Sequence, residues 1–479
     1  MLFRHTSHYL TASAVSGIFG FLSAVAFTRL LDPAEYGVYV VGVSVGGFVS
    51  AVLFTWVRYS AMRFQSEGDG VDVRATSLAA YGLSAAVAPV AVAGVAYFSG
   101  LSPARAACAL VFSLGLSLFE LGQELLKSRL QTRAYVLSSI LRSVAAFGLC
   151  LVVTGLGGGG VGQLAMAAAA YFVAIAYSTP AIWTRPIAPI DRSKLKTFLR
   201  LGAPITISGF VFTFHSSLDR LFVAWSLGDS AAGLYGASAD LIRQIILIPS
   251  SAVAAAAIPL AVRALSEGDE DAARLHLEES GELLLAILLP VSIGAALTSP
   301  HLASFLLGPA FRETAATIMP ILAFAWLFSS ISNSYVHISF HLAKRPELTI
   351  AHGAATLAVN ICSLWPLTAA FGLPGAAISL VLAEGVGLLV AFAMTRHAHP
   401  MPLLLGPLLR VISASAIMTL AVLAVETLLP GRSGVSFTVL AASGALAYGI
   451  AALWLDIAGA RSLALGALSR QRLNLLRAR

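Results

Sequence analysis

The feature that most constrains this chain is a succession of apolar runs, each long enough to cross a lipid bilayer as a helix. A helix rises about 1.5 Å per residue, so about 20 apolar residues cross about 30 Å of hydrocarbon. Such runs fall into groups of six, six and two. The fourteen predicted spans are 9–31, 37–57, 75–98, 104–127, 135–154, 161–183, 200–224, 233–262, 281–298, 316–340, 349–370, 374–394, 408–427 and 435–457. The sequence therefore predicts an all-α membrane protein.

The composition agrees with this prediction. Hydrophobic residues make up 58% of the 479 residues and charged residues 11%, whereas a soluble domain carries about 25% charged residues. A membrane β-barrel is disfavoured, because its strands alternate apolar and polar residues, and these runs are apolar on every side. The chain lacks the polar residues that would cover the surface of a soluble protein.

Basic residues indicate the orientation. With fourteen spans and the N-terminus inside, most of the 30 Lys and Arg residues fall in cytoplasmic segments. The segments on the opposite side hold only Arg29, Arg105, Arg312 and Arg432. Positive charge on the inner side predicts that both ends are cytoplasmic. The first span has a signal peptide as its alternative interpretation, which we disfavour because the apolar run continues to Leu31.

Two internal repeats indicate that the chain is built from duplicated halves. The turn in FTRLLDPAEYGVYV (27–40) returns in LFVAWSLGDSAAGLYG (221–236), and the glycine-rich TGLGGGGVG (154–162) has a counterpart in FGLPGAAIS (371–379). Duplicated halves with a binding site between them are a common transporter plan. The predicted parts are an N-terminal lobe (1–184), a basic cytoplasmic linker (185–199), a C-terminal lobe (200–396), two extra helices (397–457) and a basic amphipathic cytoplasmic tail (458–479).

These same stretches carry a resemblance to a known family. FTRLLDPAEYGVYVVG, SLDRLFVAWSLGDSAAGLYGASADL and FGLPGAAIS resemble the corresponding parts of Wzx-type oligosaccharide flippases, of the multidrug/oligosaccharidyl-lipid/polysaccharide (MOP) exporter superfamily. The resemblance covers the whole chain. It implies a MATE-like fold of 14 transmembrane helices, with two six-helix lobes related by pseudo-twofold symmetry, two extra C-terminal helices, and a central cavity that opens alternately to each side.

The resemblance also implies a function. A flippase of this type, acting as a monomer in the bacterial inner membrane, translocates an undecaprenyl-diphosphate-linked oligosaccharide by alternating access. The product serves surface polysaccharide synthesis, with membrane lipids, a polysaccharide polymerase and a chain-length regulator as expected partners and no nucleic acid. The alternatives are a cation-coupled multidrug exporter of the same fold and a membrane polysaccharide polymerase or ligase.

Polar residues inside the spans are the candidate functional residues. A charged residue at the centre of a span costs about 2.5–3.5 kcal/mol if it faces lipid, so these residues face a cavity or a partner. Glu120 and Glu124 belong to a polar stripe on one face of span 104–127. Arginines suit a diphosphate, because the guanidinium binds phosphate through a planar fork. The substrate-binding candidates are Arg58, Arg142, Arg220, Arg243, Glu120, Glu124, Asn333 and Asn360.

Four further residues are candidates for coupling transport to H⁺ or Na⁺: Asp219, Asp240, Glu384 and His337. Each polar residue also has a structural interpretation. Asp240 and Arg243 are spaced to form a local ion pair, Asp219 can pair with an arginine of another helix, and the asparagines can simply join helices.

Enzyme activity is not predicted. GLGGGG (155–160) satisfies the pattern G-x-G-x-x-G, but it joins two spans and follows no strand, so it does not indicate nucleotide binding. The three cysteines lie at unrelated places and predict no metal site. Apart from a coupling ion, no cofactor is expected.

Overall fold

The computed structural model describes residues 2–66, 72–184, 187–429 and 431–462, and in these residues every regular element is a helix. The helices of the first half are α1 (Leu2–Leu30), α2 (Pro33–Ser66), α3 (Arg74–Ser99), α4 (Pro103–Ser128), α5 (Thr132–Gly155), α6 (Gly159–Ile182) and α7 (Arg192–Leu227). Those that follow are α8 (Asp229–Ser266), α9 (Glu270–Leu297), α10 (Ser299–Leu306), η1 (Pro309–Phe311), α11 (Arg312–Ile331), η2 (Ser332–Val336), α12 (His337–Leu342), α13 (Pro346–Phe371), α14 (Leu373–Thr395), α15 (Leu405–Glu426), α16 (Gly434–Trp454) and η3 (Ile457–Gly459).

Twelve helical segments of the described chain are long and apolar enough to cross a membrane. Of the first predicted span, residues Ala14–Leu30 form a shorter apolar helix. The seventh predicted span lies in α7, which begins with several basic residues and is not among the twelve. The count of fourteen therefore stays a prediction. The predicted amphipathic tail (458–479) falls largely on residues 463–479, outside the described residues.

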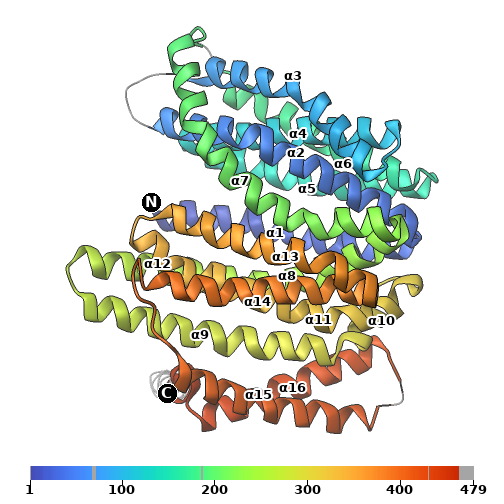
Figure 1. The fold of residues 1–479 in the computed structure, drawn as a ribbon, viewed down its shortest axis with the longest axis vertical. Coiled ribbons are helices and arrows are strands. Elements are labelled where there is room, and N and C mark those ends of the chain that lie inside the picture. Colours follow the sequence, from blue (N-terminus) through green and yellow to red (C-terminus); the bar gives the residue numbers. More distant parts are fainter. Residues whose placement is uncertain (1, 67–71, 185–186, 430, 463–479) are drawn as a thin grey trace, which may run out of the picture. The chain divides into compact units, whose positions relative to one another are not determined.

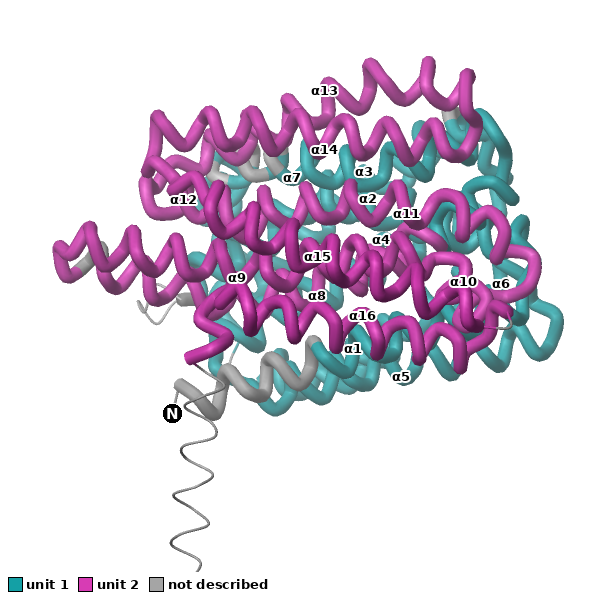
Figure 2. Tube along the Cα trace, turned by 90° about the horizontal axis from the view of Figure 1, so that it is seen from below, with its two compact units in different colours: residues 1–237 teal, residues 238–479 magenta. Residues whose placement is uncertain are grey.

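The chain divides into two compact units, Met1–Ala237 and Ser238–Arg479 (Figure 2). The first unit contains α7, which the sequence analysis assigns to the C-terminal lobe. Along its length α7 packs on α2, where Phe48 contacts the rings of Phe210 and Phe214 at centroid distances of 5.7 and 5.6 Å. The boundary between the compact units lies within α8, and the division into lobes at the linker 185–199 stays a prediction.

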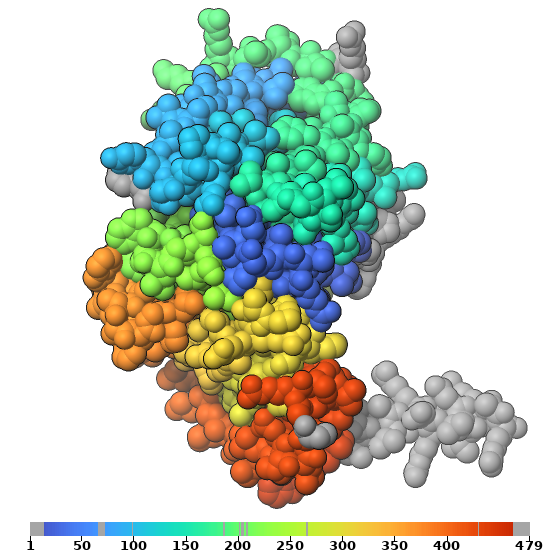
Figure 3. Space-filling model, turned by 90° about the vertical axis from the view of Figure 1, so that its right-hand side faces the viewer, coloured from blue at the N-terminus to red at the C-terminus, as the bar shows by residue number. Residues whose placement is uncertain are grey.

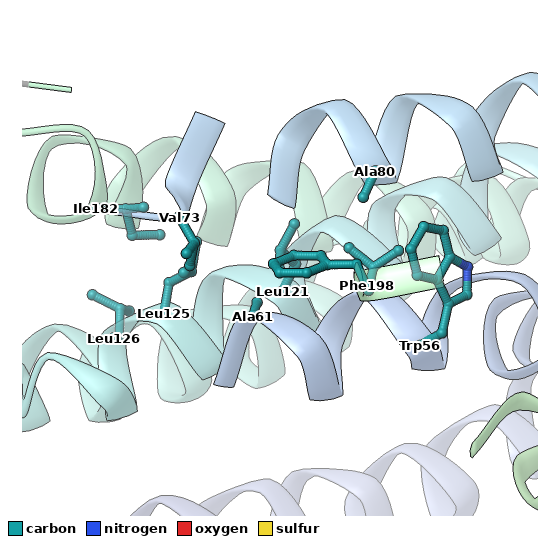
Figure 4. Packing of buried hydrophobic residues seen from close by; sticks show 10 residues of the cluster. Trp56, Ala61, Val73, Ala80, Leu121, Leu125, Leu126, Ile182 and Phe198 are labelled. Carbon is teal, nitrogen blue, oxygen red and sulfur yellow. The ribbon is translucent and has the colours of Figure 1, made fainter. Parts of the chain in front are cut away.

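The core of the first unit forms around α2. Trp56 and Ala61 of α2 pack with Leu121 of α4, Ala80 of α3 and Phe198 of α7 (Figure 4). The Phe64 and Phe198 rings stack with their centroids 5.2 Å apart. In Figure 1, α2 runs among these helices in the upper part of the view. Burying its apolar residues on several sides makes α2 the element that positions its neighbours.

Glycines allow the two repeated hairpins that the sequence predicts. In the first, Gly157 has a φ of +78° between α5 and α6, and in the second Gly372 has a φ of +62° between α13 and α14. A residue with a side chain rarely adopts this left-handed region. Beyond the second turn, a β-carbon on Gly375 would overlap the Leu367 carbonyl. Both turns need glycine to bring consecutive helices together.

The second unit contains the paired helices α13 and α14, with α11 packed on α14. On another side, α9 contacts α15, and α15 pairs with α16. Figure 3 shows this red C-terminal pair beside the yellow part of the chain that includes α9. One turn of π-helix, η2, interrupts the path from α11 to α12. Such turns occur mostly as local bulges, frequently at functional sites.

Candidate functional site

An ion pair between α2 and α4 is the centre of the candidate site in the first unit. Arg58 on α2 lies 2.7 Å from a carboxylate oxygen of Glu120 on α4. The two helices are parallel neighbours. Nearer their N-terminal ends, a hydrogen bond of 2.8 Å between the hydroxyls of Ser50 and Ser117 joins them. The Arg58 and Glu120 side chains are 27% and 38% exposed, so the pair is accessible as well as formed.

The neighbouring carboxylate on α4 makes a separate pair. Glu124 accepts a hydrogen bond of 2.9 Å from the Lys127 ammonium, three residues along the same helix. Lys127 also lies 5.4 Å from the centre of the Tyr135 ring on α5. Although Glu120 and Glu124 share the predicted helix face, only Glu120 reaches an arginine of another span.

Arg142 on α5 contributes a second guanidinium. It donates a hydrogen bond of 2.9 Å to the Ser143 hydroxyl, and its central carbon lies 5.6 Å from the centre of the Tyr171 ring on α6. Tyr171 interacts electrostatically with both Arg142 and Glu120, which brings the three groups into one region. Among the described residues, no carboxylate forms an ion pair with Arg142.

We call Arg58, Glu120, Arg142 and Tyr171 the anion cluster. With Glu120 ionised, the cluster holds two guanidinium groups and one carboxylate, while Glu124 and Lys127 neutralise each other. An excess positive charge held among apolar helices favours an anion as the missing partner. Sequence reasoning found Arg58, Glu120 and Arg142 but missed Tyr171, because nothing distinguishes an aromatic residue in an apolar span from ordinary packing.

The candidates Asp219 and Arg220 on α7 have a different environment. Asp219 is 5% exposed and accepts a hydrogen bond of 3.2 Å from the phenolic O–H of Tyr235, which is also buried. Arg220 interacts electrostatically with the same tyrosine. The structure thus brings Asp219, Arg220 and Tyr235 together, and Tyr235 lies within the repeated stretch 221–236.

On α8 the spacing of Asp240 and Arg243 gives the local pair that the structural interpretation predicts. Their closest oxygen and nitrogen lie 3.5 Å apart. The Arg243 guanidinium also lies 5.9 Å from the centre of the Trp326 ring on α11. Arg243 therefore joins α8 to α11 in addition to neutralising Asp240.

The two candidate asparagines have unequal roles. Asn360 on α13 is completely buried, and its side-chain oxygen accepts a hydrogen bond of 2.8 Å from Ser379 on α14. Asn333 in η2 is exposed and donates to the Ser329 carbonyl one turn earlier, at 2.8 Å. Asn360 acts as a link between helices, whereas Asn333 presents its side chain at the surface of its unit.

His337 belongs to a buried polar group at the start of α12. Its Nε2 lies 3.0 Å from Nδ1 of His352 on α13, and Nε2 of His352 lies 3.3 Å from the Thr356 hydroxyl. A β-carbon on Gly387 of α14 would overlap that hydroxyl. Glu384, one turn before Gly387, is only 7% exposed. His337 directly follows the π-helical turn, whereas His352 lies on α13.

The second unit also holds an apolar cavity of about 470 Å³. Its walls come from α8, α9, α10, α15 and α16, and include Ile245, Pro290, Met418, Phe437, Leu440 and Tyr448. The Tyr448 hydroxyl donates to the Ala286 carbonyl at 2.7 Å, so its polar end already has a partner. The sequence predicted the two extra helices but did not indicate that they line an apolar pocket.

A further group of contacts joins the start of α3 to the end of α6 in the first unit. Arg74 is 4% exposed, and it donates to both Asp72 oxygens at 2.8 and 2.6 Å and to the carbonyls of Ile182 and Thr184 at 2.6 and 2.7 Å. These bonds hold the Asp72 pKa at about 2, with the Arg74 side chain as the largest cause. We call this the Arg74 clamp. Sequence reasoning counted Arg74 only as an inner-side basic residue.

No group of three or more His, Cys, Asp or Glu side chains that could hold a metal ion occurs among residues the structure describes.

Comparison with known proteins places this geometry in context. Residues 26–316 match the family model described as "Polysaccharide biosynthesis protein". No curated protein matches the sequence. Among solved structures, the fold is similar to the lipid II flippase MurJ in an inward closed conformation. That match has a TM-score of 0.76 and 15% identity, and covers 94% of this chain and 98% of that one.

A second solved structure is the inward-facing conformation of a multidrug resistance MATE family transporter of the MOP superfamily. Its TM-score is 0.59 at 16% identity, covering 81% of this chain and 93% of that one. At these identities the likeness establishes the fold, which is MATE-like and all-α, as the sequence predicted.

Proposed function

This chain belongs to the polysaccharide biosynthesis protein family, and we propose that it is a flippase rather than an enzyme. Its cargo in this proposal is an undecaprenyl-diphosphate-linked oligosaccharide, which it moves by alternating access from the cytoplasmic to the outer leaflet of the bacterial inner membrane. The observation that carries the proposal is Arg142, which has a serine and an aromatic ring beside it and no ion-paired carboxylate among the described residues.

The anion cluster suggests how the diphosphate is received. In the structure, Glu120 occupies Arg58 at 2.7 Å. A phosphate that enters beside Arg142 is a second anion within reach of Arg58, and it has more acceptor oxygens than a carboxylate. Arg58 therefore breaks its ion pair with Glu120 and binds the phosphate. Once the cargo leaves, Arg58 forms its ion pair with Glu120 again. Glu120 thereby keeps the guanidinium from remaining unpaired in an apolar surrounding between transport cycles.

The apolar cavity supports a lipid-linked cargo. Its lining is almost free of polar groups, and it lies among spans of the second unit. We propose that it receives part of the polyprenyl chain, since burying each CH₂ group contributes about 0.8 kcal/mol. A free sugar phosphate has no apolar chain that could fill such a cavity.

A cation-coupled multidrug exporter is the alternative function on this fold. A cationic drug would meet the two guanidinium groups of the anion cluster, which repel it. The cluster therefore favours the anionic cargo.

Surface polysaccharide in cells that depend on this protein tests the proposal. We expect Arg142→Ala to reduce export strongly and to leave lipid-linked precursor on the inner leaflet, and Arg142→Lys to be milder because it keeps the charge but loses the fork. Arg274→Ala is the control, because Arg274 forms an exposed pair with Glu278 on α9. Normal export with Arg142→Ala expressed at the usual level would contradict the proposal.

A further inference from the structure

Four polar atoms on facing stretches of α8 and α11 are buried without a hydrogen-bond partner. Within the described residues they are Nε of Arg243, Oε1 of Gln244, Nε1 of Trp326 and the Ser330 hydroxyl. Buried polar atoms without a partner number only a few per 100 residues in native proteins, and each needs an explanation. A group of them on two neighbouring helices indicates a ligand that is itself polar.

The two stretches are held against each other. Arg243 lies 5.9 Å from the centre of the Trp326 ring, and two turns further along the helices the hydroxyls of Ser250 and Ser334 are 2.7 Å apart. Ser330 lies on α11 midway between Trp326 and Ser334, four residues from each, so these three residues share one helix face. The Arg243 side chain is 43% exposed and forms the open side of the group.

The chemistry of these groups fits a sugar better than a phosphate. Arg243 and Trp326 offer N–H donors, Gln244 offers an acceptor, and Ser330 can do either. A phosphate would leave the Gln244 oxygen unpaired and would meet the Asp240 carboxylate, 3.5 Å from Arg243. A sugar hydroxyl both donates and accepts, and the faces of sugar rings pack on aromatic side chains.

We propose that Arg243, Gln244, Trp326 and Ser330 form a subsite for a neutral sugar of the cargo. The subsite rests on the proposed function and deepens it. This subsite recognises the saccharide, which is the part of the cargo beyond the diphosphate. Asp240 contributes by neutralising Arg243, so the subsite carries no net charge that would attract a second anion.

Two lipids distinguish recognition of the saccharide from recognition of the diphosphate. Binding of undecaprenyl diphosphate and of the same lipid carrying a single glucose is measured on the full chain in nanodiscs. We expect the wild type to bind the glycosylated lipid more tightly. Trp326→Phe keeps a ring and loses the N–H, so it should weaken binding of the glycosylated lipid about threefold to tenfold and leave the bare lipid unchanged. Ser330→Ala should act in the same direction.

Trp454→Phe is the matched control, because Trp454 on α16 is 71% exposed. Equal affinity of the wild type for both lipids, or equal weakening of both by Trp326→Phe, would overturn the subsite. Arg142→Ala should weaken both lipids alike. If it weakens binding of neither lipid, the assignment of Arg142 to the phosphate is wrong. The ratio of the affinities for the glycosylated and the bare lipid still tests the subsite. A wild type that binds neither lipid would overturn both proposals.

Discussion

Gly37 on α2 and Gly233 on α8, the counterpart glycines of the repeated turn, lie directly against each other. A β-carbon on Gly37 would overlap the Asp229 carbonyl, and one on Gly233 would overlap the Pro33 carbonyl. Beside them Arg105 and Asp229 form an ion pair of 2.5 Å. Positions that are equivalent in the two halves of the sequence therefore meet in the fold, and each needs the absence of a side chain for the other to approach.

An alanine at either glycine should destabilise this crossing. We expect Gly37→Ala and Gly233→Ala each to lower the free energy of unfolding by about 1–3 kcal/mol, because the methyl group forces two backbones apart. Thermal unfolding in detergent measures the effect. Gly47→Ala is the control, since nothing lies within 4 Å of a β-carbon there. Equal stability of the Gly37 and Gly47 variants would show that the crossing is looser than described.

Anion affinity should respond differently to the two carboxylates of α4. Glu120→Gln releases Arg58, so we expect undecaprenyl diphosphate to bind about threefold to tenfold more tightly. Glu124→Gln removes the same charge one turn away but frees only Lys127, and should change the affinity less. Titration of both variants with this lipid makes the comparison. An equal gain in both would indicate that net charge, and not release of Arg58, sets the affinity.

The carboxylates of α4 show which contacts the sequence could predict. Helix periodicity placed Glu120 and Glu124 on one face, and both do lie on that face of α4. Periodicity does not identify the neighbouring helix, so it could not predict that Glu120 reaches Arg58 whereas Glu124 pairs within its own helix. The local Asp240–Arg243 pair was predictable because its spacing alone determines it.

The roles of the aromatic residues in both sites could not be predicted from the sequence. Tyr171 and Trp326 lie in apolar spans, where an aromatic ring is ordinary, and only their arginine neighbours from other helices give them a role. The hairpins were predictable for the opposite reason. Their glycines lie close together in sequence, and the turns at Gly157 and Gly372 depend on local backbone geometry.

The Arg74 clamp should make stability depend on pH at the acidic end. The Asp72 pKa lies at about 2 in the folded protein, against 3.8 for the unperturbed group. Folding therefore gains stability from ionised Asp72 above pH 3.8, and this gain is lost as the pH falls towards 2. Asp72→Asn should lower the free energy of unfolding by about 3–5 kcal/mol near neutral pH, because the buried Arg74 loses a carboxylate that it binds at both oxygens.

Unfolding temperature measured across this pH range gives the readout for the clamp. The wild type should lose stability at acidic pH more steeply than Asp72→Asn, in which the titrating group is absent. Glu267→Gln, which removes the partner of the highly exposed Arg263, should behave like the wild type. Parallel pH profiles for the wild type and Asp72→Asn would show that Asp72 does not contribute this dependence.

His337 is the coupling candidate with the most suitable surroundings, and we expect His337→Gln to uncouple transport from a proton gradient while lipid binding persists. Its Nε2 can share one proton with His352 at 3.0 Å, and His341 is the other titratable group that acts on it. One charge that crosses about 100 mV gains about 2.3 kcal/mol, enough to bias a transport cycle.

The remaining coupling candidates are tested in the same assay, with imposed H⁺ or Na⁺ gradients across proteoliposomes. Asp219→Asn, Asp240→Asn and Glu384→Gln complete the set, and His276→Gln on the exposed start of α9 is the control. Unchanged gradient dependence in all four candidate variants would remove these residues from the coupling mechanism.

The central claim is that this protein moves a lipid diphosphate across a bilayer through Arg142. Reconstitution into liposomes that contain fluorescent glycosylated undecaprenyl diphosphate tests it most directly. An H⁺ or Na⁺ gradient is imposed, and a membrane-impermeant reductant irreversibly destroys each label that reaches the outer leaflet. We predict that the wild type exposes nearly all of the label over time, whereas protein-free liposomes expose about half and Arg142→Ala is slower by at least about tenfold. Folded wild-type protein that exposes no more label than empty liposomes would contradict the account.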